Sequence, residues 1–118
     1  MDLPCGPSSL RYDALVDVSG DLDEADESAP EQPPASLPDE VLVYTLPSRY
    51  CLSDELADDA WRLFGGITPG WQRVQRICDY VHDSIKWQSG ASSPLTTAMD
   101  VYRSCTGVCR DFAQLAIS

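Results

Sequence analysis

The sequence of 118 residues has no long apolar run, few basic residues and a single histidine. Without a stretch of about eighteen apolar residues, the chain has no candidate for a membrane-spanning helix. Its first residues also lack the basic and apolar regions that make up a signal peptide. We therefore expect a soluble protein that is located in the cytoplasm.

Lysine and arginine are scarce, with eight basic residues against nineteen acidic ones and a net charge of −11. Fifteen of the acidic residues lie in residues 1–60, where only two arginines oppose them. This half of the chain would repel a phosphate backbone, so the charge pattern excludes a basic nucleic-acid-binding surface. We interpret the acidic excess as a source of solubility rather than as a binding site.

Cysteine is present but in an odd number, which does not suit a closed set of disulfides. Since a signal peptide is also missing, we expect free thiols in a reducing compartment. The five cysteines are Cys5, Cys51, Cys78, Cys105 and Cys109.

The first third of the chain contains one predicted strand and a linker. Residues 10–18 alternate imperfectly between apolar and polar side chains and include β-branched and aromatic residues, which favours a strand. Residues 19–40 combine acidic residues with several prolines, a composition that cannot bury enough apolar surface to fold. Residues 41–44 form a short apolar run, which we interpret as a brief extended segment.

Apolar residues recur at helical spacing through the rest of the chain, which predicts a mainly helical fold. Ser53, Thr68 and Ser93 are suitable N-caps, and prolines follow the last two in the favoured first position. The clearest amphipathic pattern runs from Trp71 to about Trp87. The predicted helices cover residues 53–64, 68–87, 93–106 and 109–117.

The last predicted helix begins with a candidate nucleophile, Cys109. Gly107 before it predicts a turn with positive φ, because glycine has no Cβ to clash there. Unpaired N–H groups and the positive end of the helix dipole favour a thiolate at such a position, and Arg110 adds positive charge. The structural alternative is a small buried side chain at a helix start. Asp111 is expected to cap this helix or to pair with an arginine.

Three further patterns could carry chemistry. His82 could act as a base, although a histidine on the helix surface is the simpler interpretation. Cys78 and His82, together with Cys105 and Cys109, form two pairs at i,i+4 that zinc could bind tetrahedrally if the helices faced each other. Cys78 and Cys105 are otherwise explained as packing residues. The three tryptophans could line a substrate cleft, but at helical spacing we interpret them as core.

Four blocks of the sequence resemble the bacterial branch of the transglutaminase-like superfamily, from about residue 41 to the end. They are LPSRYC (46–51), CDYVHDSI (78–85), SPLTTA (93–98) and GVCRDFAQLA (107–116). The resemblance implies a catalytic cysteine at Cys109 and a histidine and an aspartate that come after it. It also implies a partial α+β papain-like or transglutaminase-like core, truncated after the nucleophile helix.

The same resemblance divides the chain into three parts and gives it a function. Residues 1–18 would be the remnant of an N-terminal β domain, 19–40 the acidic linker and 41–118 the helical N-terminal half of the core. The expected activity is acyl transfer or hydrolysis at carboxamide or peptide bonds through a thioester on Cys109. We expect this chain, as a fragment without the histidine and the aspartate, to be catalytically silent.

The sequence predicts no cofactor and no metal, and a protein or peptide as substrate. The apolar face of the last helix, formed by Phe112, Leu115, Ala116 and Ile117, would lack the sheet that covers it, so a homodimer is expected. Two other functions stay open. The chain could be a non-catalytic interaction module on the same scaffold, or a zinc-stabilised helical domain.

Overall fold

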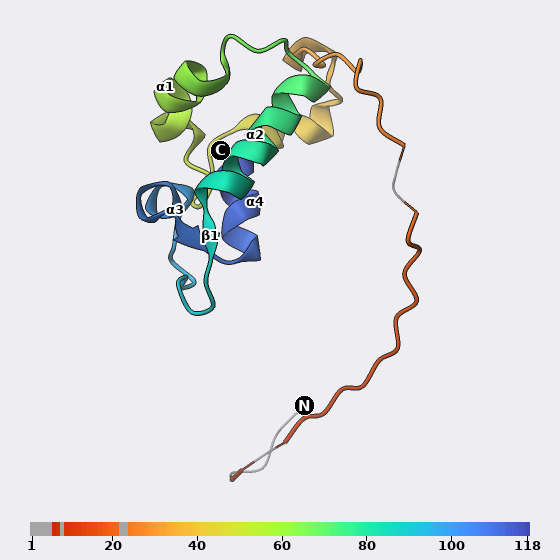
Figure 1. Cartoon of the computed structure of the whole chain (residues 1–118), viewed down its shortest axis with the longest axis vertical. Helices are drawn as coiled ribbons and strands as arrows, with labels where there is room; N and C mark the ends of the chain where they lie inside the picture. Colours follow the sequence, from red (N-terminus) through yellow and green to blue (C-terminus); the bar gives the residue numbers. More distant parts are fainter. Residues whose placement is uncertain (1–5, 8, 22–23) are drawn as a thin grey trace.

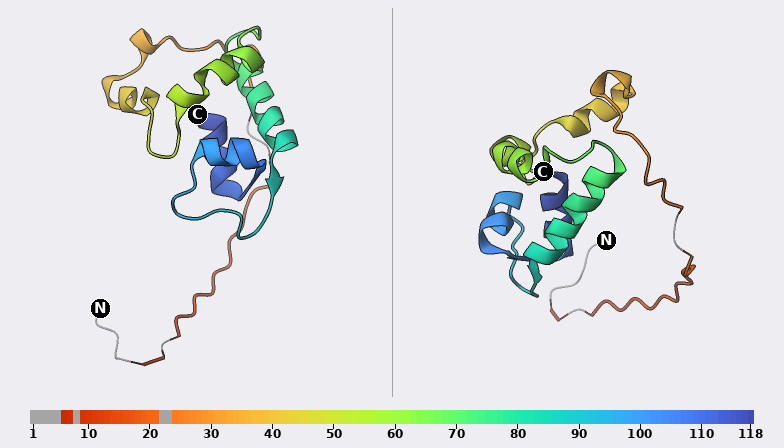
Figure 2. Two further views of the ribbon diagram at one scale, coloured as in Figure 1. Left: turned by 90° about the vertical axis from the view of Figure 1, so that its left-hand side faces the viewer. Right: turned by 45° about the horizontal axis from the view of Figure 1, so that its top comes forward.

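The computed structural model describes residues 6–7, 9–21 and 24–118. The regular elements are mainly helices, and the first of two short strands follows directly from the end of the second α-helix (Figures 1 and 2). In chain order the elements are η1 (Pro34–Ser36), η2 (Asp39–Thr45), α1 (Ser53–Phe64), α2 (Trp71–Ser84), β1 (Lys86–Trp87), α3 (Ala98–Ser104), β2 (Thr106–Gly107) and α4 (Cys109–Ile117), where η denotes a 3-10 helix. Within the described part of the chain, none of the helices is long and apolar enough to cross a membrane.

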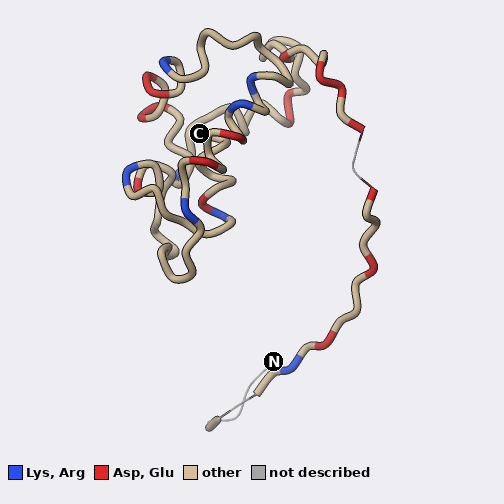
Figure 3. Tube along the Cα trace, viewed as in Figure 1, with Lys and Arg blue, Asp and Glu red and all other residues tan. Residues whose placement is uncertain are grey.

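Residues 9–21 run as an extended tail away from the helices (Figure 1). The strand predicted over residues 10–18 does not form, because no neighbouring strand among the described residues pairs with it. Its apolar side chains are exposed, with exposed fractions of 99% for Leu10 and 101% for Leu15. Acidic residues outnumber basic ones along the tail, whereas most basic residues lie in the helical part (Figure 3). The N-terminal β-domain remnant stays a prediction.

The predicted linker contacts the helical part near the start of α2. The Trp71 N–H donates to the Ala29 carbonyl at 3.0 Å, and Glu31 pairs with Arg73 at 3.2 Å. The short extended segment predicted at residues 41–44 is instead part of the 3-10 helix η2, which Pro38 precedes as N-cap. Residues 29–31 of the linker therefore lie against α2, which their composition did not predict.

The predicted ends of α1 are confirmed, but α2 is shorter than predicted. Leu52, rather than Ser53, is the N-cap of α1. Helix α2 begins at Trp71 and not near Thr68, because Gly70 before it has a φ of 111°, outside the helical region. It ends at Ser84, since the following residue adopts extended backbone and leads into β1.

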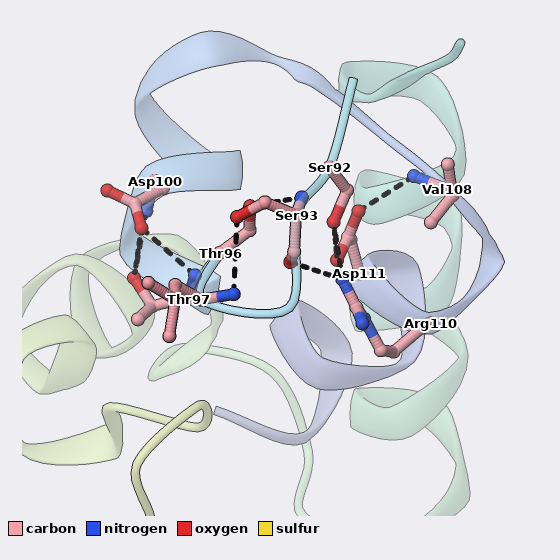
Figure 4. Close-up of polar contacts among 9 residues, drawn as sticks. Ser92, Ser93, Thr96, Thr97, Asp100, Val108, Arg110 and Asp111 are labelled. Carbon is pink, nitrogen blue, oxygen red and sulfur yellow. Dashed lines mark hydrogen bonds and ion pairs between the residues drawn. The ribbon is translucent and has the colours of Figure 1, made fainter. Parts of the chain in front are cut away.

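Helix α3 begins at Ala98, not at the predicted cap Ser93, because Thr97 forms a reciprocal capping box. The Asp100 N–H donates to the Thr97 hydroxyl at 3.3 Å, and the Thr97 N–H donates to the Asp100 carboxylate at 2.9 Å. The Ser93 N–H instead donates to the Thr96 hydroxyl at 2.9 Å and closes a turn before the helix (Figure 4).

We expect Asp100→Ala to destabilise the protein at neutral pH and to have less effect in acid. Hydrogen bonds from the Thr97 backbone and side chain hold the pKa of Asp100 below its ordinary value of 3.8. A carboxyl with a lowered folded-state pKa stabilises folding above its unfolded pKa, and this contribution disappears as the pH falls through the folded value. Urea unfolding of both proteins at about pH 7 and about pH 2.5 measures it. An equal difference at both pH values would contradict this expectation.

The hydrophobic core lies where α2, α3 and α4 meet, and α1 packs against α2 (Figure 2). Its buried members are Leu56, Val81, Ile85, Ala98, Met99, Val101 and Leu115. Phe112 and Ala116 pack against this cluster and are partly buried. The interpretation of the tryptophans as core residues is wrong, since Trp61, Trp71 and Trp87 have exposed fractions of 72%, 38% and 61%.

Candidate functional site

Cys109 is the first residue of α4, as the sequence predicted, and it is exposed. Val108 before it is the N-cap and has extended backbone, with φ of −111° and ψ of 174°. N–H groups in the first turn of a helix have no intrahelical acceptor and lie at the positive end of the dipole. The thiol is therefore accessible to a substrate, and the Cys109 N–H is a suitable donor to an oxyanion.

The carboxylate of Asp111 is the polar centre of the site and is fully buried. It accepts hydrogen bonds from the Val108 N–H at 2.8 Å and from the Ser92 hydroxyl at 2.9 Å. The Arg110 Nε also donates to it, at 3.4 Å (Figure 4). Asp111 thus caps the helix and pairs with an arginine, so both parts of the prediction are confirmed. Because its bond to Val108 fixes the residue before the thiol, Asp111 sets the start of α4.

The guanidinium of Arg110 is bound to the loop that precedes α3. Its Nη2 donates to the Ser92 hydroxyl and to the Ser93 carbonyl, the latter at 2.8 Å (Figure 4). Its charge lies next to the buried carboxylate of Asp111. We conclude that Arg110 is engaged by three groups and that its charge is shared with Asp111 rather than reserved for the Cys109 thiol.

Gly107 lies in β2 and does not have the positive φ that the sequence predicted. The residue with left-handed backbone is Cys105, the C-cap of α3, with a φ of 53°. Glycine is required at position 107 for space instead. A Cβ there would lie 2.9 Å from the Asp111 Cβ and 3.4 Å from Val101 Cγ1. The chain therefore passes close against the buried carboxylate.

We expect Gly107→Ala to lower the free energy of unfolding by about 1–3 kcal/mol, the usual cost of overpacking a filled interior. The added methyl group would press on Asp111, whose position is fixed by its bond to Val108. Urea unfolding followed by circular dichroism measures the change. Gly66→Ala is the matched control, since a Cβ at Gly66 would meet open space. Equal stability of the two variants would show that the close contact is unimportant.

Two short parallel strands bring Trp87 beside the turn that leads to the thiol. Trp87 of β1 pairs with Gly107 of β2, and the Gln88 N–H donates to the Gly107 carbonyl at 2.9 Å. Trp87 is largely exposed at this place. Of the three tryptophans, it is therefore the one that the fold brings next to the segment of Cys109. Strands of two residues carry too little periodicity to be predicted from sequence.

The other candidate residues do not gather around Cys109. His82 is on the surface of α2, as predicted, and its Nδ1 lies 3.1 Å from Asp83. Among residues 6–7, 9–21 and 24–118, no group of three or more histidine, cysteine or acidic residues could hold a metal ion. The two proposed zinc pairs thus do not form a site there.

The interpretation of Cys78 and Cys105 as packing residues is wrong. Cys78 is exposed although helical spacing places it on the same face of α2 as Val81. The core covers the end of α2, where Val81 and the following Ile85 are buried, and the earlier Val74 is 53% exposed. Cys105 is exposed as well, at the end of α3. Neither is a packing residue. Cys5 lies outside the described residues.

Ser92 was not among the residues predicted from the sequence, although its hydroxyl joins Arg110 and Asp111 to the loop before α3. The full burial of the Asp111 carboxylate was not predicted either. One signal in the sequence was available. Asp111 lies in the first turn of an apolar helix, where a carboxylate can cap the backbone. The identity of its partner, nineteen positions earlier in the chain, has no such local signal.

The comparisons with known proteins agree with this arrangement. A family model described as the transglutaminase-like superfamily matches residues 60–118, half of the chain. The chain belongs to the transglutaminase-like superfamily. The resemblance to this superfamily is thereby confirmed, and so is the prediction of a mainly helical, partial transglutaminase-like core. No curated protein matches the chain.

A solved structure supports the same assignment. It is a candidate cysteine protease from Cytophaga hutchinsonii, with 36% sequence identity and a TM-score of 0.71. The match covers 73% of this chain and 30% of that protein, so the chain spans less than a third of its length. The family match and the name of this neighbour support a cysteine enzyme family, and the cysteine at the start of α4 lies within the segment matched to the family model.

Proposed function

We propose that this chain supplies the nucleophile of a bacterial transglutaminase-like cysteine enzyme. The observation that carries the proposal is the exposed Cys109 at the first position of α4, within the segment matched to the family. The sulfur would attack the carbonyl carbon of a carboxamide or peptide, and the resulting oxyanion would accept a hydrogen bond from the Cys109 N–H. The 36% identity to a candidate bacterial cysteine protease supports the branch.

The acyl transfer then needs a proton donor and a base. Collapse of the tetrahedral intermediate breaks the C–N bond, and the leaving nitrogen takes a proton, which leaves a thioester on Cys109. An amine or water then attacks that thioester and releases the thiol. His82, the one histidine of the chain, is exposed and paired with Asp83. We therefore propose that the base and its aspartate lie outside these 118 residues and that this chain alone is inactive.

A pair of assays tests both statements. One polypeptide is the 118-residue chain, and the other extends it through the histidine and aspartate that the resemblance implies. Each is incubated with a glutamine-containing peptide and a fluorescent primary amine. We expect amine incorporation and amide hydrolysis only with the longer polypeptide. If the short chain turned over substrate and His82→Ala abolished that turnover, His82 would be the base.

The alternative is a non-catalytic interaction module, which an apolar pocket beside the end of α4 favours. The pocket has a volume of about 190 Å³ and is lined by residues of α1, α2, α3 and α4, among them Leu63, Ile77, Tyr102 and Ile117. Burial raises the pKa of Tyr102 above its ordinary value. An active cysteine enzyme would lose its activity on alkylation of Cys109, whereas an interaction module would keep its binding.

We also propose that the substrate is a protein or peptide and that the protein is located in the cytoplasm. We further propose that two copies of the chain associate through α4. Three of the four apolar residues on the α4 face already pack on or within the chain's own core, and Ile117 remains 72% exposed. Burial of one such side chain in a dimer contributes about 1.5–3 kcal/mol. Ile117→Asp should then shift a dimer to the monomer in sedimentation. A compact monomer at high concentration without the substitution would refute the association.

A further inference from the structure

We propose that Ser92 is a positioning residue for the nucleophile. Its hydroxyl lies between the buried carboxylate of Asp111 and the guanidinium of Arg110, and it ties the loop before α3 to the first turn of α4. The inference rests on the proposed function only in its consequence for catalysis. The effect on the reactivity of Cys109 can be measured without any substrate.

The hydroxyl of Ser92 is part of a hydrogen-bond network at the start of α4. The Ser92 hydroxyl donates to Asp111 Oδ1 at 2.9 Å and accepts from Arg110 Nη2. Arg110 Nε donates to the same carboxylate oxygen at 3.4 Å. The other carboxylate oxygen, Oδ2, accepts the Val108 N–H at 2.8 Å. One side chain from the loop therefore contacts both charged residues that follow Cys109 (Figure 4).

This network fixes the thiol through its neighbours on both sides. Val108 precedes Cys109 and is held by Asp111, whereas Arg110 follows Cys109 and is held by Ser92 and by the Ser93 carbonyl. Loss of a hydrogen-bond donor to the buried Asp111 carboxylate would destabilise the folded chain, because a buried charge needs hydrogen bonds to be stable. A fixed first turn keeps its free N–H groups and the positive end of the helix dipole beside Cys109.

The neighbouring Ser93 offers a matched comparison. Its hydroxyl bonds only within the loop, to the Leu95 N–H at 3.2 Å and to the Thr96 hydroxyl at 3.3 Å. Its bond with Arg110 uses the backbone carbonyl, which any residue retains. Ser93→Ala thus removes a serine hydroxyl from the same loop without removing a contact to Arg110 or Asp111.

The test measures iodoacetamide alkylation of each cysteine in the native chain, by mass spectrometry, from about pH 6 to about pH 9. Cys78, exposed on α2, serves as the internal reference thiol. With Ser92→Ala we expect the alkylation of Cys109 at neutral pH to slow by about two- to fivefold, the size of a charge interaction with a helix N-terminus. The alkylation rate of Cys78 should be unchanged.

Two further variants separate positioning from general loosening. Ser92→Thr keeps the hydroxyl and should restore the pH profile of Cys109, and Ser93→Ala should match the unsubstituted chain. An unchanged Cys109 profile in Ser92→Ala would overturn the proposal. Equal changes at Cys109 and Cys78 would also overturn it, because they indicate loss of the fold. Failure of the proposed function would instead appear as absent amine incorporation in an extended polypeptide whose Cys109 profile is normal.

Discussion

Replacement of Cys109 with alanine is expected to abolish thioester formation and to lower amine incorporation by about three to six powers of ten in the active extended polypeptide. Cys109 is the exposed thiol at the first position of α4, and alanine there removes only the sulfur. Since the proposed thioester forms on the Cys109 sulfur, the remaining machinery of the variant acts without its nucleophile. Mass spectrometry of the acylated protein and the rate of amine incorporation measure the two effects.

The controls for this experiment come from the other exposed cysteines. Cys78→Ala and Cys105→Ala remove thiols of residues that are also exposed but lie outside the first turn of α4. We expect both variants to keep the activity, and the Cys109 variant to keep the helical circular dichroism. Retention of the activity by Cys109→Ala would refute the assignment of the nucleophile.

The second large effect is expected from Asp111→Ala, which should lower the free energy of unfolding by about 2–4 kcal/mol. The substitution removes a fully buried carboxylate and leaves the Val108 N–H and the Ser92 hydroxyl without their acceptor. For a helical domain of this size the loss corresponds to a fall in Tm of roughly 10–25 °C. Thermal unfolding followed by circular dichroism measures it.

Asp83→Ala is the matched control for the buried carboxylate. Asp83 is also on a helix and also has a polar partner, His82, but its side chain is 79% exposed. Exposed ion pairs contribute about 0–1 kcal/mol, so the Tm of this variant should stay within a few degrees of the unsubstituted chain. If Asp111→Ala were no more destabilising than Asp83→Ala, the buried network would not hold the start of α4.

The sequence by itself determined roughly where the four α-helices lie and that Cys109, the candidate nucleophile, begins the last of them. Apolar residues at helical spacing and local end signals placed α1 and α4 correctly, because these signals depend on residues within one or two turns. The cysteine motif at residues 107–116 also indicated the family, since a run of neighbouring residues carries it. Each of these features can be read within a short window of the chain.

The tertiary structure decided which faces are buried and why particular residues are needed. The strand pattern at residues 10–18 has no partner strand among the described residues, and Trp61, Trp87 and Cys78 are exposed. Gly107 is required because the Asp111 side chain occupies the space beside it, not because of its φ. Strand pairing and burial require contacts between distant segments, so a pattern within one segment cannot report them.

The same reason separates the two halves of the candidate site. Cys109 and its helix start are local features, and the sequence alone placed them. The bonds of Ser92 to Asp111 and Arg110 span nineteen and eighteen positions and exist only once the loop folds against α4. A buried charge must find its donors wherever the fold brings them, and here it brings them from a loop whose sequence shows only a turn.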